Sequence, residues 1–434
     1  MKGRCIILEP SLISILRDHL FRLRGEAEKM LCHLVSIPSV SGEEGAAQRE
    51  LYNLFSSLKG KTDLIPMKES LRSDPKFASG IHVPFSDRPQ TRYGWKGKGK
   101  ARSLILCAHV DVVKPGDWKE AFQPRLEGDL VYGRGSVDDK AGIVSIFLAL
   151  KALQTMAVDL LGDVDVHLTN EEEVGMAGAL AFVREGFRAD GVLVVEPTDH
   201  KIYIAHRGCL QFTIHVEGKQ AHLGNKRYGV NAIEKAAKII DAFVRYEDRL
   251  IEEGRGYPLF ESFEYPGQVN IGIIQGGDFF STVPDAVTME GGVGFLPMKT
   301  MEEVEKELKE VIHGIDDPWL RDHVQIRFNG LKNDPYRMPM GHPFTEALKK
   351  TLSSLGRTPE IGGMMASCDA RHYFNLGGMP AVIYGGNNGP LSHARDEHAE
   401  IPDVLETAVE YAAFLIDWCG RAEGDIIEKT KESA

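Results

Sequence analysis

The stretch Ser103-Leu104-Ile105-Leu106-Cys107-Ala108, followed by His109-Val110-Asp111, decides our prediction of the fold. A continuous apolar run of this kind is typical of a strand that is buried on both faces of a parallel sheet. Further strand-like runs at Asp163–Thr169 and Gly191–Val195 alternate with helix-like segments at Ala141–Leu153 and Ala177–Glu185. We therefore predict an α/β protein with a mainly parallel sheet and helices on both faces.

The pattern changes after Gly208, where a strand, a helix, two strands, a second helix and a last strand are expected. We predict them at Leu210–Val216, Val230–Leu250, Val269–Ile274, Ala286–Phe295, a helix capped by Thr300 and Glu303, and Val324–Phe328. This order is that of a ferredoxin-like α+β module. We predict that residues 208–330 form a lid or dimerisation domain inserted between two parts of a catalytic domain, residues 1–207 and 331–434. One N-terminal helix is expected over Leu12–Leu34.

Composition limits the classes of function. A chain of 434 residues with a formal net charge of −12 would repel a phosphate backbone, so nucleic-acid binding is not expected. The six cysteines form no Cys-x-x-Cys pair, which favours reduced thiols. No run is long and apolar enough for a membrane span or a signal peptide, so we predict a cytoplasmic protein that does not bind membranes.

Metal-ligating residue types recur where the predicted strands end. They are His109, Asp138, Glu173, Glu196 and His393. In an open α/β sheet the ligand-binding crevice lies at these strand ends. Two imidazoles and three carboxylates, one of them shared, can hold two divalent cations. Glu172 is then available as a general base, and Asp111 could accept the second ring N–H of His109. The pattern predicts metal-assisted hydrolysis.

Each signal also has an ordinary structural explanation. His109 alone could be a satisfied structural histidine, and Asp138 could be a helix N-cap. Glu171-Glu172-Glu173 could be an acidic surface turn. Three adjacent glutamates in a buried crevice would repel one another unless cations neutralised them, so we favour the metal site.

Longer motifs resemble those of the co-catalytic di-zinc aminoacylases and exopeptidases, especially the branch of acetylornithine deacetylases and succinyl-diaminopimelate desuccinylases. The resemblance extends from Ser36-Ile37-Pro38-Ser39 to His393–Glu397. Its most specific parts are Gly133-Arg134-Gly135 with Asp138, Glu172-Glu173-Val174-Gly175, Val195-Glu196-Pro197-Thr198, and Ala205-His206-Arg207-Gly208 continuing to His222. It implies a zinc-exopeptidase-like catalytic domain.

The resemblance also implies individual roles. Asp138 would bridge two metal ions, preferably Zn²⁺ although Co²⁺ and Mn²⁺ also suit the ligands. His109 and Glu196 would complete one site, and Glu173 and His393 the other. His222 would polarise the substrate carbonyl, often from the partner subunit of a homodimer built through the inserted domain. Arg371 and Asn270 are the substrate-binding candidates. Alternatively, His222 could cap the following helix and Arg371 could pair with Asp369.

Three departures from the family pattern affect the expected function. Asp139 stands where many deacylases carry methionine, and an aspartate there is common among dipeptidases. Asn170-Glu171 replaces a proline-aspartate lead-in, so we assign Glu172 as the base by counting back from Gly175. Gly292-Val293-Gly294 replaces an aspartate-x-arginine that helps relatives to bind substrate.

We therefore expect a hydrolase that cleaves the amide bond of a small N-acyl amino acid. The alternatives are a metal-dependent dipeptidase or carboxypeptidase and, with less support, a catalytically silent homologue.

Overall fold

The computed structural model of the chain describes residues 10–387 and 389–422. They divide into two compact units. Unit 1 contains the chain up to Ile204, Met338–Gly362 and the chain from Cys368 onward, and unit 2 contains Ala205–Arg337 and Gly363–Ser367. Unit 2 is thus an insertion in the sequence of unit 1. No helix in the described part of the chain has the length and apolarity needed to cross a membrane.

The nine-stranded main sheet is mixed, with a parallel centre in unit 1. Its order is β1 (Lys61–Ile65), β2 (Gln90–Trp95), β6 (Val164–Thr169), β3 (Leu104–His109), β7 (Val192–Val194), β18 (Ala381–Ile383) and β8 (Ile202–His206), which also pairs with β16 (Tyr336–Arg337) and β17 (Ile361–Met364). The pairs between β6, β3, β7 and β18 are parallel, whereas β1, β2 and β8 add to the sheet in antiparallel fashion. All six residues of β3 are buried, as predicted for a central strand.

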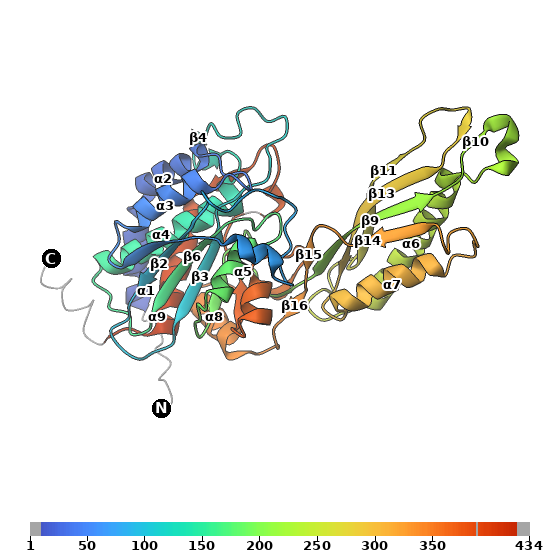
Figure 1. Cartoon of the computed structure of the whole chain (residues 1–434). Coiled ribbons are helices and arrows are strands. Elements are labelled where there is room, and N and C mark those ends of the chain that lie inside the picture. The colour runs from blue at the N-terminus through green and yellow to red at the C-terminus, as the bar shows by residue number, and fades with distance from the viewer. Residues whose placement is uncertain (1–9, 388, 423–434) are drawn as a thin grey trace, which may run out of the picture. The chain divides into compact units, whose positions relative to one another are not determined.

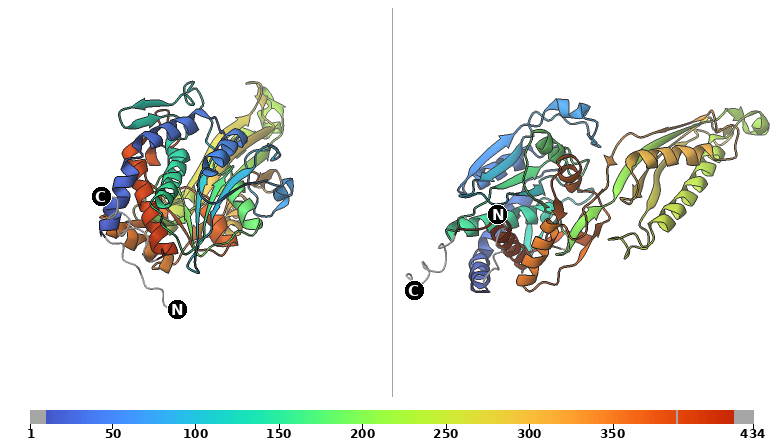
Figure 2. Two further views of the ribbon diagram at one scale, coloured as in Figure 1. Left: turned by 90° about the vertical axis from the view of Figure 1, so that its left-hand side faces the viewer. Right: turned by 90° about the horizontal axis from the view of Figure 1, so that it is seen from below.

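Helices cover both faces of this sheet, which confirms the predicted fold class. They are α1 (Pro10–Phe21), α2 (Arg24–Ser36), α3 (Gly45–Phe55), α4 (Ala141–Thr155), α5 (Ala177–Arg184), α8 (Pro343–Ser354) and α9 (Ile401–Cys419) (Figure 1). Helix α4 lies beside α9, as Figure 2 shows. On the face of the sheet that carries His167, the ring of His167 stacks on Phe182 of α5, and its Nδ1 lies 2.8 Å from the Tyr373 hydroxyl in η4 (His372–Leu376).

The prediction of one helix over Leu12–Leu34 is wrong. The N–H of Leu23 donates to the carbonyl of Leu20, three residues back rather than four, and Leu23 has φ −85° and ψ 8°. The chain therefore changes direction between α1 and α2. The remaining elements of unit 1 are η1 (Glu69–Ser73), η2 (Ser136–Lys140), η5 (Gly389–Leu391) and a small sheet of β19 (His398–Glu400), β5 (Leu130–Tyr132) and β4 (Arg125–Glu127).

Unit 2 has the predicted β-α-β-β-α-β order. Its elements are β9 (Gly208–Glu217), α6 (Ala232–Gly254), β11 (Gln268–Gly276), β13 (Ala286–Phe295), α7 (Met301–His313) and β14 (Val324–Arg327), with the shorter β10 (Ala221–His222), η3 (Leu223–Tyr228), β12 (Thr282–Val283) and β15 (Lys332–Asn333). The sheet order is β11-β13-β9-β14, and β15 also pairs with β9. Thr300 and Glu303 form the expected capping box at the start of α7.

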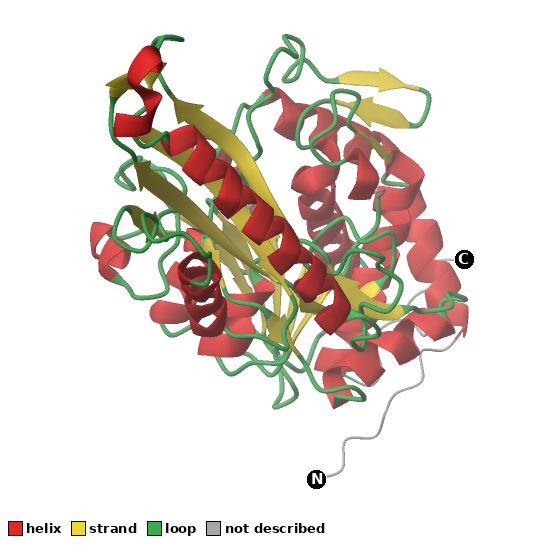
Figure 3. Ribbon diagram, turned by 90° about the vertical axis from the view of Figure 1, so that its right-hand side faces the viewer, coloured by secondary structure: helices red, strands yellow, loops and turns green. Residues whose placement is uncertain are grey.

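One face of the unit 2 sheet is buried beneath α6 and α7 (Figure 3). Leu210, Phe212, Ile214 and Val216 alternate along β9 and belong to this core. The intervening residues of β9 are only partly buried, because they face the other side of the sheet. The five cysteines in the described residues are free, and Cys5 lies outside them.

Candidate metal centre

The carboxyl ends of three neighbouring parallel strands bring the predicted residues together. His109 is the last residue of β3, Glu172 and Glu173 follow β6, and Glu196 follows β7. The register places His109 opposite Thr169, so the imidazole lies next to the turn that carries the glutamates. Asp138 joins them from η2, and His393 from the segment after η5.

Asp138 lies between two imidazoles. Its Oδ1 is 2.8 Å from Nε2 of His109, and its Oδ2 is 3.3 Å from Nε2 of His393. Nε2 of His393 is also 3.0 Å from Oε1 of Glu173. One oxygen of the Asp138 carboxylate thus faces each imidazole. His109, Asp138 and Glu173 offer ligand atoms that all lie within 4.8 Å of one another.

A second group consists of His109, Glu172 and Glu196, whose ligand atoms meet the same 4.8 Å limit. Burial and the charge of Glu196 raise the pKa of Glu172 well above its ordinary value. Burial, followed by the charge of Asp138, raises the pKa of Glu173 to about 7. These shifts reflect carboxylates that share a buried volume with too little positive charge. The donor set therefore fits divalent cations, which would neutralise it.

Asp111 fixes the backbone of the acidic turn. Its Oδ1 accepts the N–H of Glu172 at 2.9 Å, and its Oδ2 accepts the N–H of Glu173 at 3.2 Å and the hydroxyl of Ser41 at 2.7 Å. Nδ1 of His109 is 2.9 Å from the main-chain carbonyl of Asp111 and 3.7 Å from its carboxylate. Asp111 therefore holds the His109 ring through its main-chain carbonyl, while its carboxylate bonds to the glutamate turn.

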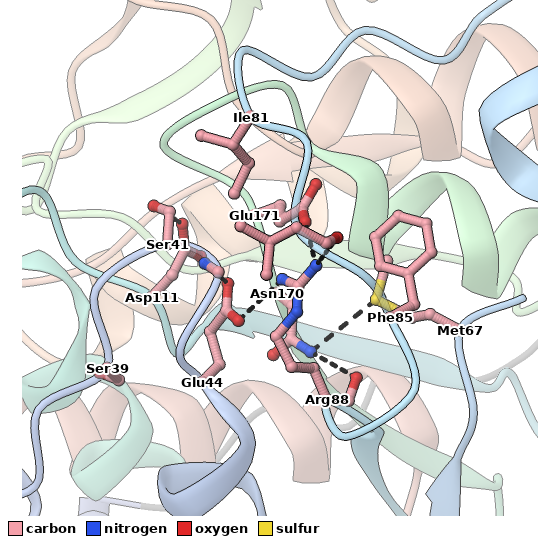
Figure 4. A network of polar contacts seen from close by, with 12 residues as sticks. Ser39, Ser41, Glu44, Met67, Ile81, Phe85, Arg88, Asp111, Asn170 and Glu171 are labelled. Atoms are coloured by element: carbon pink, nitrogen blue, oxygen red, sulfur yellow. Dashed lines mark hydrogen bonds and ion pairs between the residues drawn. The ribbon is translucent and has the colours of Figure 1, made fainter. Parts of the chain in front are cut away.

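Glu171 has different surroundings from its two neighbours. Its Oε1 pairs with Nη2 of Arg88 at 2.6 Å, and its Oε2 accepts the hydroxyl of Ser79 at 3.0 Å. Arg88 also pairs with Glu44 at 2.9 Å (Figure 4). Glu171 has φ 57°, a left-handed conformation that is uncommon outside glycine and costs on the order of 1 kcal/mol or more. The buried ion pairs stabilise this conformation, which turns Glu172 and Glu173 toward the cluster.

A second buried ion pair supports the other side of the cluster. Arg134 pairs with Glu397, and it donates from Nη2 to the carbonyl of His393 at 3.0 Å. Oε1 of Glu397 accepts the N–H groups of Val137 at 3.0 Å and Asp138 at 3.3 Å. No local sequence pattern indicates a role for Arg88, Glu44 or Glu397. Arg134 stands between the two glycines of Gly133-Arg134-Gly135, and a charged residue in such a turn is the sequence signal for it.

The remaining predicted residues are Arg371, His222 and Asn270. The Arg371 side chain is 1% exposed and donates from Nη2 to the carbonyl of Gly175 at 3.1 Å, so it braces the end of the acidic turn. His222 and Asn270 belong to unit 2, and both are exposed. Nδ1 of His222 accepts the N–H of Gly224 at 3.1 Å, which is the capping contact considered as the alternative.

A cluster of imidazoles and carboxylates at the carboxyl edge of a parallel sheet is the site of a metal-dependent hydrolase. Comparison with known proteins agrees. The model of Peptidase family M20/M25/M40 matches residues 105–417, and the chain belongs to this family. The resemblance noted from the sequence motifs is thereby confirmed.

Three similar proteins illustrate the range of the family. An N-formyl-4-amino-5-aminomethyl-2-methylpyrimidine deformylase of Bacillus subtilis (strain 168) is 28% identical over 74% of this chain and 80% of its own length. An acetylornithine deacetylase of Edwardsiella ictaluri is 24% identical over 89% of this chain and 96% of its own. A tripeptidase structure from Staphylococcus aureus has a TM-score of 0.72 at 18% identity, covering 90% of this chain and 97% of that one, and shows the fold alone.

Proposed function

We propose that the protein hydrolyses the amide bond of an N-acyl amino acid, with Glu172 as the general base. The observation that carries this proposal is that Glu171, Glu172 and Glu173 have different surroundings. Glu171 is engaged by Arg88, and Glu173 lies 3.0 Å from the imidazole of His393, the other proposed ligand of its site. This leaves Glu172, which lies close to His109 and Glu196, to act as the base. Counting back from Gly175 selects the same residue.

The residues of unit 1 would hold two divalent cations, with Zn²⁺ as the preferred ion for this donor set. His109, Glu196 and Asp138 would hold one, and His393, Glu173 and Asp138 the other. Bound cations supply Lewis acidity that polarises the amide carbonyl and lowers the pKa of water. Glu172 then accepts a proton from the attacking water and delivers it to the leaving amine.

Unit 2 is proposed to act as a lid that supplies His222. Because Nδ1 of His222 accepts a main-chain N–H, the neutral ring carries its proton on Nε2 and can donate it to the carbonyl oxygen. A donor of this kind contributes about 3–4 kcal/mol to transition-state stabilisation. Arg371 is proposed to brace the acidic turn of the metal centre in unit 1 through the carbonyl of Gly175. Asn270 is proposed to contact substrate.

Unit 2 is also proposed to form a homodimer through β11. This strand ends the sheet order, and its Ile273 and Ile274 are 47% and 51% exposed. An exposed apolar edge strand is a ready template for pairing with a second copy. Sedimentation should show a dimer. A fully active monomer would exclude a histidine supplied by a partner subunit. The cytoplasmic location stays a prediction from the sequence.

A substrate panel tests the proposed function. Metal-loaded protein is assayed with acetylornithine, N-succinyl-diaminopimelate, acetyl-methionine, simple dipeptides and the formylated aminopyrimidine named for the B. subtilis relative. We expect the highest kcat/KM with one of the three N-acyl amino acids. Preference for dipeptides would support the second candidate, a dipeptidase, which Asp139 favours, and preference for the formylated pyrimidine would contradict the amino-acid specificity.

A further inference from the structure

Asp369 is a buried carboxylate of unit 1 that the proposed mechanism does not use. It lies just before η4 and is 1% exposed. Its Oδ2 accepts the hydroxyl of Thr169 at 2.7 Å and the thiol of Cys107 at 3.5 Å, whereas its Oδ1 has no hydrogen-bond partner among the residues that the structure describes. Burying a carboxylate that is only half satisfied is costly for the fold. A carboxylate kept at this cost is a candidate for a functional role.

Thr169, the hydrogen-bond partner of Asp369, connects two parts of the metal centre. It is the last residue of β6, and it pairs in register with His109 at the end of β3. Its carbonyl accepts the N–H of Val110 at 2.9 Å, and its hydroxyl lies 3.3 Å from the carbonyl of Ala108. Thr169 is thus bonded to the residues on both sides of His109. Because the glutamate turn follows β6 closely, the position of Thr169 affects the turn as well.

Arg371, which follows Asp369 closely in the chain, holds the opposite end of the glutamate turn. Its Nη2 donates to the carbonyl of Gly175 at 3.1 Å, and its Nε lies 3.1 Å from the sulfur of Met176. Asp369 and Arg371 therefore contact the chain before and after Glu171-Glu172-Glu173 from one short segment. A segment that bonds to both flanks of a turn limits how far the turn can shift.

The charge of Asp369 also acts on the metal centre. Burial and the charge of Glu196 raise the pKa of Glu172 well above its ordinary value, and the charge of Asp369 contributes to this rise. Burial raises the pKa of Asp369 to about 6, although the hydrogen bond from Thr169 and the charge of His109 oppose the rise. Hydrogen bonding and charge thus both place Asp369 beside the cluster.

We propose that Asp369 is a positioning residue of the metal centre, which holds His109 and the glutamate turn in place through Thr169. This proposal rests on the proposed function, because it takes His109 as a metal ligand and Glu172 as the base. Asp369 itself binds neither metal nor substrate. A hydrogen bond to a carboxylate is stronger than one between neutral groups, so it fixes Thr169 firmly. Loss of a group that orients ligands typically changes metal affinity or activity about tenfold to a hundredfold.

The metal affinity of the full-length protein tests this proposal without any turnover. Thr169→Val removes the hydroxyl at nearly constant volume, and it should weaken Zn²⁺ binding about tenfold in competition with a fluorescent chelator. Thr169→Ser keeps a hydroxyl and should recover most of this loss. In the Co²⁺-loaded protein the visible absorption bands report the arrangement of the ligands, and they should shift in Thr169→Val.

A second buried threonine provides a matched control. The hydroxyl of Thr351 donates to Oδ2 of Asp417 at 2.7 Å and to the carbonyl of Ala347 at 3.1 Å, in helices α8 and α9, which contribute no proposed ligand. Both valine variants should lower the melting temperature, but only Thr169→Val should change the Zn²⁺ affinity and the Co²⁺ spectrum. If Thr169→Val and Thr351→Val lower the melting temperature alike and neither changes a metal measurement, Asp369 is only a structural residue and the proposal is overturned.

A double variant tests whether Asp369 acts through Thr169. Asp369→Asn replaces the carboxylate by an amide of the same shape, which is a weaker acceptor, so it should weaken Zn²⁺ binding. If the two residues act as a unit, adding Thr169→Val to Asp369→Asn causes much less loss than Thr169→Val causes in the wild type. Losses that multiply would show that Asp369 acts by its charge alone, and they would overturn the positioning role.

The positioning role and the proposed function can fail separately. With a substrate from the panel, Thr169→Val should lower kcat about tenfold and leave KM within about twofold, because neither Thr169 nor Asp369 is proposed to contact substrate. If the metal measurements change as expected but no amide is hydrolysed, the positioning role stands and the proposed function fails. If amides are hydrolysed and Thr169→Val leaves kcat and Zn²⁺ affinity unchanged, the function stands and the positioning role is wrong.

Discussion

Arg88 and Glu171 form an ion pair of 2.6 Å in which the two side chains are only 4% and 0% exposed. Glu44, also 0% exposed, binds the same guanidinium at 2.9 Å. A guanidinium shared by two buried carboxylates stabilises the backbone conformation of Glu171, which directly precedes the proposed general base. The stability of the fold and the position of Glu172 are therefore coupled through Arg88.

Arg88→Met is expected to destabilise the protein strongly, by about 3–5 kcal/mol, because it leaves two buried carboxylates without their cation. Urea unfolding at pH 7 measures this change. Arg245→Ala is the matched control, since its ion pair with Asp241 is exposed (63% and 67%), and its effect should stay within about 0.5 kcal/mol. Wild-type stability of Arg88→Met would show that the three-residue network is not formed in solution.

Glu172→Gln should remove catalysis without removing metal. Loss of a general base lowers kcat by about a hundredfold to ten-thousandfold. Metal content, measured by atomic absorption, should remain that of wild type. Glu171→Gln provides the comparison, and it should act mainly on stability because Glu171 bonds to Arg88 and Ser79. If Glu171→Gln abolished turnover and Glu172→Gln did not, the general base would be Glu171 and not Glu172.

The sequence was sufficient to predict the parallel centre of the sheet and the strand-end residues, because buried strands and their polar ends are local patterns. His109, Glu172 and Glu196 follow directly from three such strands. The supporting residues were not predictable in this way. Arg88 and Glu44 reach the acidic turn from parts of the chain 83 and 127 positions away (171 − 88 and 171 − 44), and no local pattern signals such a contact.

The same limit applies to Asp111 and Leu23. The spacing of His109 and Asp111 correctly indicated contact, but not that the carbonyl would bond to the ring while the carboxylate bonded to the glutamate turn. The helical pattern across Leu23 concealed a break, because both helices bury apolar residues at helical spacing.

Removal of metal should abolish activity and lower the melting temperature, and the loss of stability should depend on pH. The pKa of Glu173 is raised to about 7 in the fold without metal, by burial and by Asp138. A raised carboxylate pKa contributes stability below its unfolded value, near 4.5, and this contribution is lost as pH rises through 7. The metal-free protein should therefore become less stable between pH 5 and pH 7.

Bound cations replace the missing positive charge, so the metal-loaded protein should not show this decline. Calorimetric scans with and without a chelator measure the gap in melting temperature, which we expect to widen from pH 5 to pH 7. A gap that is constant or narrower at pH 7 would contradict the account of the carboxylate cluster. Full activity after exhaustive chelation would contradict metal dependence itself.

His200 should make stability fall at alkaline pH, independently of the metal. Burial opposes its protonation, but contacts with Asp403 at 2.7 Å and Glu410 at 3.0 Å outweigh burial and raise its pKa to about 9. The contribution is fully present below the unfolded pKa of 6.5 and is lost as pH rises through 9. It amounts to roughly 3 kcal/mol.

Unfolding free energies of wild type and His200→Gln test this at pH 6 and pH 10. The variant should be less stable at pH 6 and close to wild type at pH 10. A difference of equal size at both values would mean that the histidine acts through packing and not through its charge.

Glu397→Gln should weaken metal binding although Glu397 is not a proposed ligand. Its carboxylate accepts the N–H of Asp138 and pairs with Arg134, which in turn bonds to the carbonyl of His393. Glu397 therefore orients both the carboxylate of Asp138 and, through Arg134, the imidazole of His393. Loss of a group that orients ligands typically reduces metal affinity about tenfold to a hundredfold. Competition with a fluorescent zinc chelator measures this affinity.

Glu400→Gln, an exposed change on the following strand β19, is the control and should have no effect on metal affinity. Unchanged affinity in Glu397→Gln would show that Asp138 and His393 keep their positions without this support.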